Sequence, residues 1–460
     1  MTRFRPVSLA NAYGLIAFVL GLFFLFVTPP FGVGDETAHF ERAYEVATGR
    51  FLGADGLPAG LQELIDDAFG QVKALDRIAE EDFARWSKID LAAETIIPWP
   101  QPLRAVMRLH SPFCYIHLAP VVAAGVALDL PPLAIFYLGR LSALIVGVLL
   151  VRAAIAAAPT VFRPALVFIG LLPTTIVYFA AFNIESLVVG LGFYFFALVA
   201  RHAVRPDIRL APTDIATIAA VGFLLGQFKS AYLFLPFFAL ILPAAKFASR
   251  RAQALTLAAI ILPGAVATLG WAIIVKDLML GDISYSTMNG NHVEPSAQLA
   301  GVLADPFGYA VVVLRTLFAS DTPAMALLSL LGLGGWTNIK LPGVSYALLS
   351  AGLALVWMSG EKPPKIFTRP AAIALEVAIV AATALAILTL VYFQWNGVGD
   401  KVITGFQGRY LLAALPFLLA AAPYRLSLLA PPARRMAVAF GVPLLGAAAM
   451  AASVIGWYYG

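Results

Sequence analysis

Long apolar runs separated by short polar segments make up most of this chain, and they constrain its fold more than any other feature. Each run is close to the roughly 20 residues with which a helix crosses about 30 Å of hydrocarbon. Hydrophobic residues fill 61% of the 460 positions and charged residues only 12%, whereas about a quarter of a soluble domain is charged. We therefore predict an all-α, polytopic transmembrane helix bundle that forms one integral membrane domain over residues 1–460.

The apolar runs predict roughly 11 to 13 crossings. They lie at 10–27, 112–128, 133–151, 164–182, 184–200, 212–227, 230–245, 252–275, 307–335 in two short pieces, 342–358, 370–393, 408–424 and 436–457.

Basic residues orient the bundle, because Lys and Arg concentrate in cytoplasmic loops. Arg3 and Arg5 precede the first run and place the N-terminus in the cytoplasm. Four further clusters are expected on the same side: Arg201, Arg205 and Arg209; Lys246, Arg250 and Arg251; Lys362, Lys365 and Arg369; and Arg425, Arg434 and Arg435. The net charge of +5 fits these loops and gives no reason to expect nucleic acid as a partner.

This orientation places the loops 31–110 and 276–305 on the external side, with the Asn183 turn, Lys229, 336–341 and 394–407, and raises one conflict. If 112–128 and 133–151 both crossed the membrane, Arg152 and Arg163 would lie outside. We therefore expect 112–128 to be re-entrant or interfacial, which requires protein or water to cover its backbone. Residues 31–110 carry 14 of the 26 acidic residues, and their short amphipathic patterns predict juxtamembrane helices on the outer leaflet.

Asp35 and Glu36 follow directly on the first apolar run, in "PPFGVGDETAHFERAYEVATG". A helix that starts there places Asp35, His39 and Arg42 on one stripe. Asp35 could simply cap this helix, with Glu36 complementing the helix dipole. Alternatively, the two carboxylates serve as a general base or as ligands for a hard cation.

Three further positions carry polar groups at predicted external ends of spans. In "FNIESL", Asn183 and Glu185 are either functional groups at membrane depth or a helix cap and its first turn. Lys229, in "FKSAYLFLP", either binds a phosphate or extends its ammonium group to the interface. Gln407, Arg409 and Tyr410, in "GFQGRYLLAALPF", either bind phosphate through the guanidinium or anchor a helix at the interface. His292 and Glu294 are interpreted as part of a plain loop, and the single cysteine, Cys114, excludes an internal disulfide.

These motifs, together with "HSPFCYIHLAP", occur in the order seen in the bacterial membrane-protein family called domain of unknown function 2142, which the chain resembles from Pro29 to Pro416. In that family the corresponding motifs resemble PPF-x-x-x-DE-x-AHF, PPLYY, NPDSL, K-x-x-Y and QGRY. This chain departs from the pattern at Ile184-Glu185, where the family has Pro-Asp, and in "FKSAY", which lacks prolines.

The resemblance implies a GT-C-like fold and an inverting glycosyltransferase that takes its sugar from a polyprenyl-phosphate carrier. By this analogy Asp35 is the base that deprotonates the acceptor, and Glu36 and His39 orient it or share a divalent cation. Lys229 and Arg409 hold the carrier phosphate, and the substrate-binding set is completed by Arg42, Asn183, Glu185, Gln407 and Tyr410.

The same resemblance implies a bacterial inner-membrane enzyme whose active site faces the periplasm and whose acceptor is a cell-envelope glycan or lipid. Membrane lipids are expected to surround the protein. A transporter or flippase of lipid-linked saccharides is the alternative, as is a polymerase of lipid-linked repeat units. A flippase should carry functional charges on both faces or within the membrane, which the acid-rich first loop does not indicate. The sequence leaves the metal requirement open.

Overall fold

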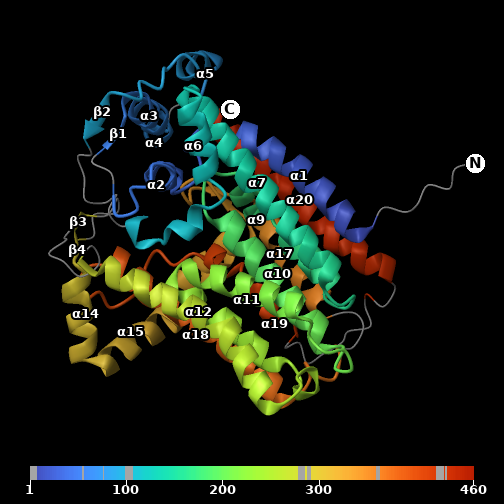
Figure 1. Ribbon diagram of the computed structural model, residues 1–460. Coiled ribbons are helices and arrows are strands. Elements are labelled where there is room, and N and C mark those ends of the chain that lie inside the picture. Colours follow the sequence, from blue (N-terminus) through green and yellow to red (C-terminus); the bar gives the residue numbers. More distant parts are fainter. Residues whose placement is uncertain are drawn as a thin grey trace, which may run out of the picture.

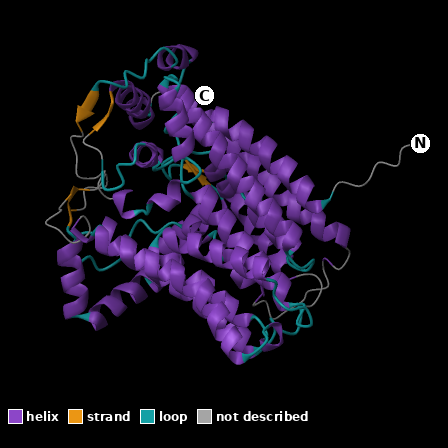
Figure 2. Ribbon diagram, viewed as in Figure 1, coloured by secondary structure: helices purple, strands orange, loops and turns teal. Residues whose placement is uncertain are grey.

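The computed structural model describes residues 8–53, 56–75, 77–98, 107–277, 285–286, 292–358, 363–420, 429 and 432–460. Arg3, Arg5, Lys362 and Arg425 of the predicted cytoplasmic clusters lie outside the described residues. The described chain is mostly helical and confirms the predicted all-α polytopic bundle, as Figure 1 and Figure 2 show. Its strands form three short antiparallel pairs: β1 (Gly56–Pro58) with β2 (Ile96–Pro98), β3 (Tyr285–Ser286) with β4 (His292–Val293), and β5 (Leu333–Gly334) with β6 (Ile339–Lys340).

Six helices of the described chain are long and apolar enough to cross a membrane: α1 (Leu9–Val27), α7 (Pro132–Ala157), α10 (Glu185–Ala203), α12 (Arg250–Ile274), α18 (Pro370–Trp395) and α20 (Pro432–Tyr458). A seventh span is possible if α14 (Pro295–Ala304) and α15 (Pro306–Phe318), which meet at 108°, act as one broken crossing. The prediction of 11 to 13 crossings therefore exceeds the number of long helices.

The difference arises because several apolar runs are broken or short. Pro173 divides the run 164–182 into α8 (Arg163–Gly170) and α9 (Pro173–Phe179), since proline disfavours the helical conformation of the residue before it. Much of the run 230–245 forms the 3-10 helix η4 (Ser230–Ile241), which contains Pro236. Other apolar runs form α11 (Pro212–Gln227), α16 (Thr322–Leu331), α17 (Gly343–Met358), η6 (Gly408–Leu411) and α19 (Leu415–Ala420).

The run 112–128 does not form a membrane-spanning helix. It contains the 3-10 turn η3 (Pro112–Tyr115) and α6 (Ala119–Ala127). The nine residues of α6 give a helix about 14 Å long, which is less than half of the hydrocarbon thickness. This agrees with the expectation that the segment is re-entrant or interfacial.

The segment 31–110 forms α2 (Glu36–Ala47) and a group of short helices joined to the β1–β2 pair. These helices are α3 (Ala59–Leu64), the π-helix η1 (Ile65–Phe69), α4 (Gly70–Ala74) and α5 (Glu80–Trp86). The predicted amphipathic patterns therefore do form helices, and their apolar residues Leu61, Ile65 and Trp86 are buried. Most of α2 is also buried, and it packs against α6 and η3.

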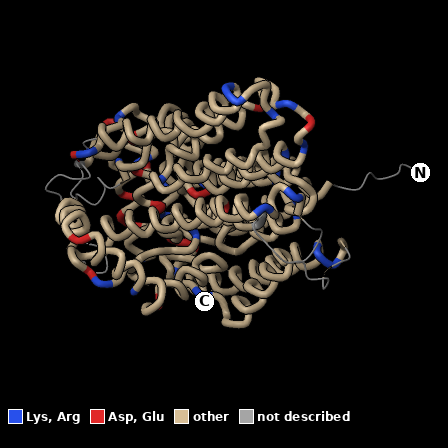
Figure 3. The backbone as a smooth tube through the Cα atoms, turned by 90° about the horizontal axis from the view of Figure 1, so that it is seen from below, with Lys and Arg blue, Asp and Glu red and all other residues tan. Residues whose placement is uncertain are grey.

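The two ends of the bundle differ in charge. Figure 3 shows Lys and Arg at both ends, whereas most Asp and Glu lie toward the end away from the start of α1. At the end where α1 begins, Arg152 donates to Asn11 and Lys246 donates to the carbonyl of Ile208. At the other end, α20 finishes beside the segment 31–110, where the Tyr458 hydroxyl donates to the carbonyl of Gly32 over 2.8 Å. The acid-rich segment 31–110 thus lies at the end of the bundle away from the start of α1.

Candidate functional site

Asp35 lies directly before α2 in a backbone conformation that is unusual for its residue type. Its φ is +71°, in the left-handed region that residues with a Cβ rarely adopt. Such strain costs of order 1–3 kcal/mol and concentrates at functional sites. Asp35 occupies the predicted N-cap position, but within the described chain its side chain makes no capping hydrogen bond. Its carboxylate is 39% exposed and is therefore accessible to a ligand.

Arg409 of η6 is the partner of this carboxylate. Its Nη2 lies 2.7 Å from Asp35 Oδ2, and its side chain is 3% exposed. The guanidinium carbon lies 4.3 Å from the ring centre of Tyr178 and 5.1 Å from that of Tyr410. Its Nε and Nη1 are buried and have no hydrogen-bond partner in the part of the chain that the structure describes. A buried guanidinium with open donors is a site for an anion.

The charge of Arg409 also sets the protonation state of Asp35. Burial acts to raise the pKa of the Asp35 carboxyl, but the charges of Arg409, His39 and Lys229 and the hydrogen bond from Arg409 outweigh it. The pKa therefore lies below its ordinary value, and Asp35 is ionised at neutral pH.

Lys229 lies just before η4, and its Nζ lies 3.5 Å from the ring centre of Tyr410. Tyr410 is held in place by its backbone, since its carbonyl accepts a 2.8 Å hydrogen bond from the Tyr232 hydroxyl. The sequence analysis assigned Lys229 and Arg409 together to the carrier phosphate, and the structure brings both cations to the same aromatic ring. This clustering does not by itself require a ligand, because cations also pack on aromatic rings for stability.

Asn183 and Glu185 begin α10. The Asn183 side chain accepts a 3.0 Å hydrogen bond from the Glu185 amide and donates to the Tyr178 carbonyl over 3.1 Å. Asn183 is fully buried, so its observed role is to fix the start of the helix. Glu185 is 7% exposed, and its Oε2 is buried without a hydrogen-bond partner among the described residues.

Glu36 is placed differently from a catalytic carboxylate. It is fully buried and forms a two-pronged ion pair with Arg140 of α7, at 2.8 and 2.7 Å. Its oxygens also accept hydrogen bonds from the amides of Val33 and Phe182. Arg140 in turn donates to the carbonyls at the end of the first span: Leu25, Thr28 and Pro29. The expectation that Glu36 orients Asp35 or shares a divalent cation does not fit this geometry, because the acceptor sites of Glu36 are occupied by structural donors.

His39 and Arg42 lie on the buried face of α2. His39 Nδ1 lies 2.9 Å from the Tyr115 hydroxyl, and burial lowers the pKa of His39 below its ordinary value against the charges of Glu185 and Asp35. Arg42 Nη1 lies 2.7 Å from Glu45, which Arg108 also contacts at 2.9 Å. Arg42 therefore belongs to a structural ion-pair network, whereas His39 lies next to the site.

The sequence reasoning missed Arg140, Tyr178 and Tyr115. Arg140 carried a usable signal, since an arginine within an apolar run is rare and needs a partner. Tyr178 lies in an apolar stretch without such a signal, and Tyr115 lies in the motif "HSPFCYIHLAP", to which no role was assigned. Gln407, which was expected to bind substrate, has a buried side-chain oxygen with no partner among the residues described.

Metal binding finds no support at this site. In the described residues no three His, Cys, Asp or Glu side chains are grouped so that they could hold a metal ion. His292 and Glu294, 2.9 Å apart, are both exposed and remain a loop pair. The divalent cation left open by the sequence is therefore not assigned.

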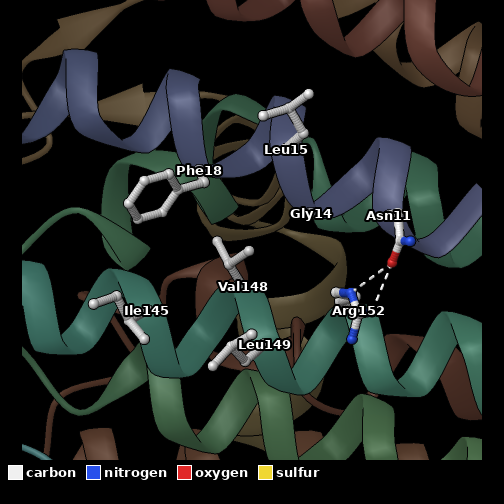
Figure 4. Close-up of a pocket in the computed structure, with 8 residues that line it drawn as sticks. All are labelled: Asn11, Gly14, Leu15, Phe18, Ile145, Val148, Leu149 and Arg152. Carbon is white, nitrogen blue, oxygen red and sulfur yellow. Dashed lines mark hydrogen bonds between the residues drawn. The ribbon is translucent and has the colours of Figure 1, made fainter. Parts of the chain in front are cut away.

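Figure 4 shows a hollow of about 360 Å³ between α1 and α7, lined by the apolar residues Leu15, Phe18, Ile145, Val148 and Leu149 with Gly14. Asn11 and Arg152 form its polar end and are joined by hydrogen bonds of 2.9 and 2.6 Å. None of the site residues lines this hollow. It is an apolar surface groove between two spans and not the candidate site.

Comparison with known proteins gives one match. The family described as "Predicted membrane protein (DUF2142)" matches residues 18–418, which include Asp35, Glu185, Lys229 and Arg409. No curated protein and no solved structure matches the chain. Because the match covers most of the sequence and agrees with the observed membrane-spanning helices, the chain belongs to this family of membrane proteins.

Proposed function

We propose that the protein is a membrane glycosyltransferase. It transfers a sugar, with inversion, from a polyprenyl-phosphate carrier to a glycan or lipid acceptor at the outer face of the bacterial cytoplasmic membrane. The observation that carries this proposal is Arg409, whose buried guanidinium has two open nitrogens beside the accessible carboxylate of Asp35. A phosphate would complete the hydrogen bonds of that guanidinium.

Arg409 and Lys229 suit the leaving-group side of the reaction. As the bond to the carrier phosphate breaks, negative charge develops on the phosphate oxygens, and fixed cations stabilise it. Both cations are held beside Tyr410. Arg42 and Arg108 are engaged by Glu45, so they are less suited to this task.

The lipid part of the carrier also has a suitable surface. Phe234 and Phe237 follow Lys229 in the chain and belong to η4. Phe113 belongs to η3, and Ile116 follows it directly. All four apolar side chains are exposed. Cys114 of η3 contacts the backbone of Gln227, which places η3 beside the end of α11 that leads to Lys229. A carrier could place its charged phosphate at Arg409 and its apolar prenyl chain along these residues. Each part of the carrier would then contact side chains of matching polarity.

One observation favours a second candidate, a flippase of lipid-linked saccharides. Glu376 of α18 is fully buried, and neither of its carboxylate oxygens has a partner in the described chain. An unpaired acid within a span is a functional candidate by default, and the glycosyltransferase proposal does not use it.

The substitution Arg409→Lys tests the proposal. It keeps the positive charge but removes the planar set of donors. We expect it to weaken donor use by about 1.5–3 kcal/mol, which is about tenfold or more in apparent affinity. The measurement is release of polyprenyl phosphate against donor concentration by purified wild-type and variant protein in one detergent.

Arg85→Lys is the matched control, because Arg85 is 48% exposed and pairs with Asp67 on the surface. It should leave the donor curve unchanged. If the curves for wild type and Arg409→Lys coincide, Arg409 is a helix anchor. If purified protein moves lipid-linked sugar across vesicles without releasing carrier phosphate, the flippase is the better description.

A further inference from the structure

We infer that Glu185, and not Asp35, accepts the proton of the acceptor hydroxyl. The inference rests on the proposed glycosyl transfer and changes the role that the sequence assigned to Asp35. Asp35 becomes a positioning residue that orients Arg409.

Glu185 differs from the neighbouring carboxylates in its pairing. Glu36 pairs with Arg140, Glu45 with Arg42 and Arg108, and Asp35 with Arg409. No Lys, Arg or His nitrogen in the described chain lies within 4.0 Å of the Glu185 carboxylate. Its Oε2 is buried and unpartnered. A general base needs a lone pair that no structural donor occupies.

Glu185 nevertheless belongs to the same site as Arg409. Its charge acts on groups from several neighbouring elements: His39 of α2, Cys114 and Tyr115 of η3, Tyr178 of α9, Tyr232 of η4 and Arg409 of η6. Its backbone amide is fixed by Asn183, so the side chain extends from a defined point at the start of α10. A rigid origin favours precise placement of a catalytic group.

The stereochemistry of inversion separates the two carboxylates. The attacking oxygen and the departing phosphate lie on opposite sides of the anomeric carbon, so the base lies away from the cation that holds the phosphate. Asp35 Oδ2 is 2.7 Å from Arg409 and is therefore on the phosphate side. Glu185 makes no ion pair with Arg409 in the described chain, and we assign it to the acceptor side.

The proposed step forms one bond and breaks one bond at the anomeric carbon. The acceptor hydroxyl forms a bond from its oxygen to the anomeric carbon and gives its proton to the Glu185 carboxylate. The bond from the anomeric carbon to the carrier phosphate breaks, and its electron pair stays on that phosphate beside Arg409 and Lys229. Glu185, now a carboxylic acid, returns the proton to water. Asp35 loses no proton and gains none.

Three variants test this division of roles: Glu185→Gln, Glu185→Asp and Asp35→Asn. Release of polyprenyl phosphate from synthetic polyprenyl-phosphate hexose and pentose donors is measured with an octyl glycoside acceptor across pH, with thermal stability in parallel. We expect Glu185→Gln to lower kcat by about 100-fold or more, the scale of general base catalysis, with little change in the donor KM. Asp35→Asn should keep most of kcat and raise the donor KM.

Glu63→Gln is the control, because Glu63 is exposed on α3, and it should match wild type. Glu185→Asp keeps a carboxylate and should retain more of kcat than Glu185→Gln does, which separates lost basicity from misfolding. If Glu185→Gln has a near-normal kcat, the inference is overturned but the proposed function is not. The same holds if Asp35→Asn loses kcat while Glu185→Gln is unaffected. No release by wild type from any donor overturns the proposed function as well.

Discussion

Two buried arginines with acidic partners, Arg140 and Arg409, show how the same residue type serves different purposes. Arg140 and its partner Glu36 are both fully buried, and their donors and acceptors are largely matched with backbone groups. Arg409 is also buried, but two of its nitrogens are open and its partner Asp35 is 39% exposed. A saturated pair stabilises a fold, whereas an unsaturated one can bind a ligand.

The pair Glu36–Arg140 leads to a stability prediction. Glu36→Gln should destabilise the protein by about 3–5 kcal/mol, because it leaves the Arg140 charge buried without a counter-charge. The measurement is the free energy of unfolding, or the unfolding temperature, of purified protein in detergent. Asp67→Asn is the control, since Asp67 and Arg85 form a surface pair that is 35% and 48% exposed and should contribute at most about 1 kcal/mol. Equal stability of wild type and Glu36→Gln would show that the pair is not structural.

At the scale of elements, close packing of helices depends on small residues. The side of α10 near Gly192 lies against the backbone that leads into α19, and a Cβ at Gly192 would collide with the carbonyl oxygen of Ala413. Without a hydrophobic driving force between spans, such close backbone approach is a main source of helix association in membranes. The position therefore links α10, which carries Glu185, to the segment that follows Arg409.

We predict that Gly192→Ala destabilises the protein by about 1–3 kcal/mol, the cost of overpacking a filled interface. Thermal unfolding in detergent measures this. Gly441→Ala in α20 is the matched control, because a Cβ there would meet no atom within 4 Å, and alanine favours a helix over glycine. The packing argument is wrong if the two substitutions have the same effect.

A proline accompanies the break in one apolar run. The run 370–393 contains Pro370 only at its start, and α18 extends unbroken to Trp395. The run 164–182 contains Pro173 near its middle and is divided. Proline does not always have this effect, because Pro263 lies within the continuous helix α12. Counting apolar residues therefore overestimated the number of spanning helices.

At the scale of the whole molecule, the position of the acid-rich segment along the bundle leads to a prediction of topology. Ser87 follows α5 in the acid-rich segment 31–110, and Thr213 lies at the start of α11 beside the basic end. Both are exposed. In intact cells an impermeant thiol reagent should label Ser87→Cys but should label Thr213→Cys only after lysis, because basic loops face the cytoplasm.

Cys114 need not be removed for this experiment. Its thiol is buried, and burial raises its pKa above the ordinary value, so it should react poorly. The reverse labelling pattern would place the candidate site on the cytoplasmic side and contradict the proposed acceptor.

The sequence by itself determined the class of fold and the segments that matter. Apolar composition leaves few alternatives to helices in a membrane, since each backbone polar group must be satisfied within the segment. It also indicated that Asp35, Glu185, Lys229 and Arg409 occupy ends of apolar runs, which is a local property.

Only the tertiary structure decided how these groups pair. Asp35 and Arg409 are 374 positions apart, and nothing in the local sequence states that they meet while the adjacent Glu36 turns to Arg140. Pairing depends on which helices pack together and on which donors each buried carboxylate meets. For that reason the sequence placed Asp35 and Glu36 in one site, whereas the packed bundle leaves Asp35 accessible, Glu36 saturated and Glu185 without a counter-charge among the described residues.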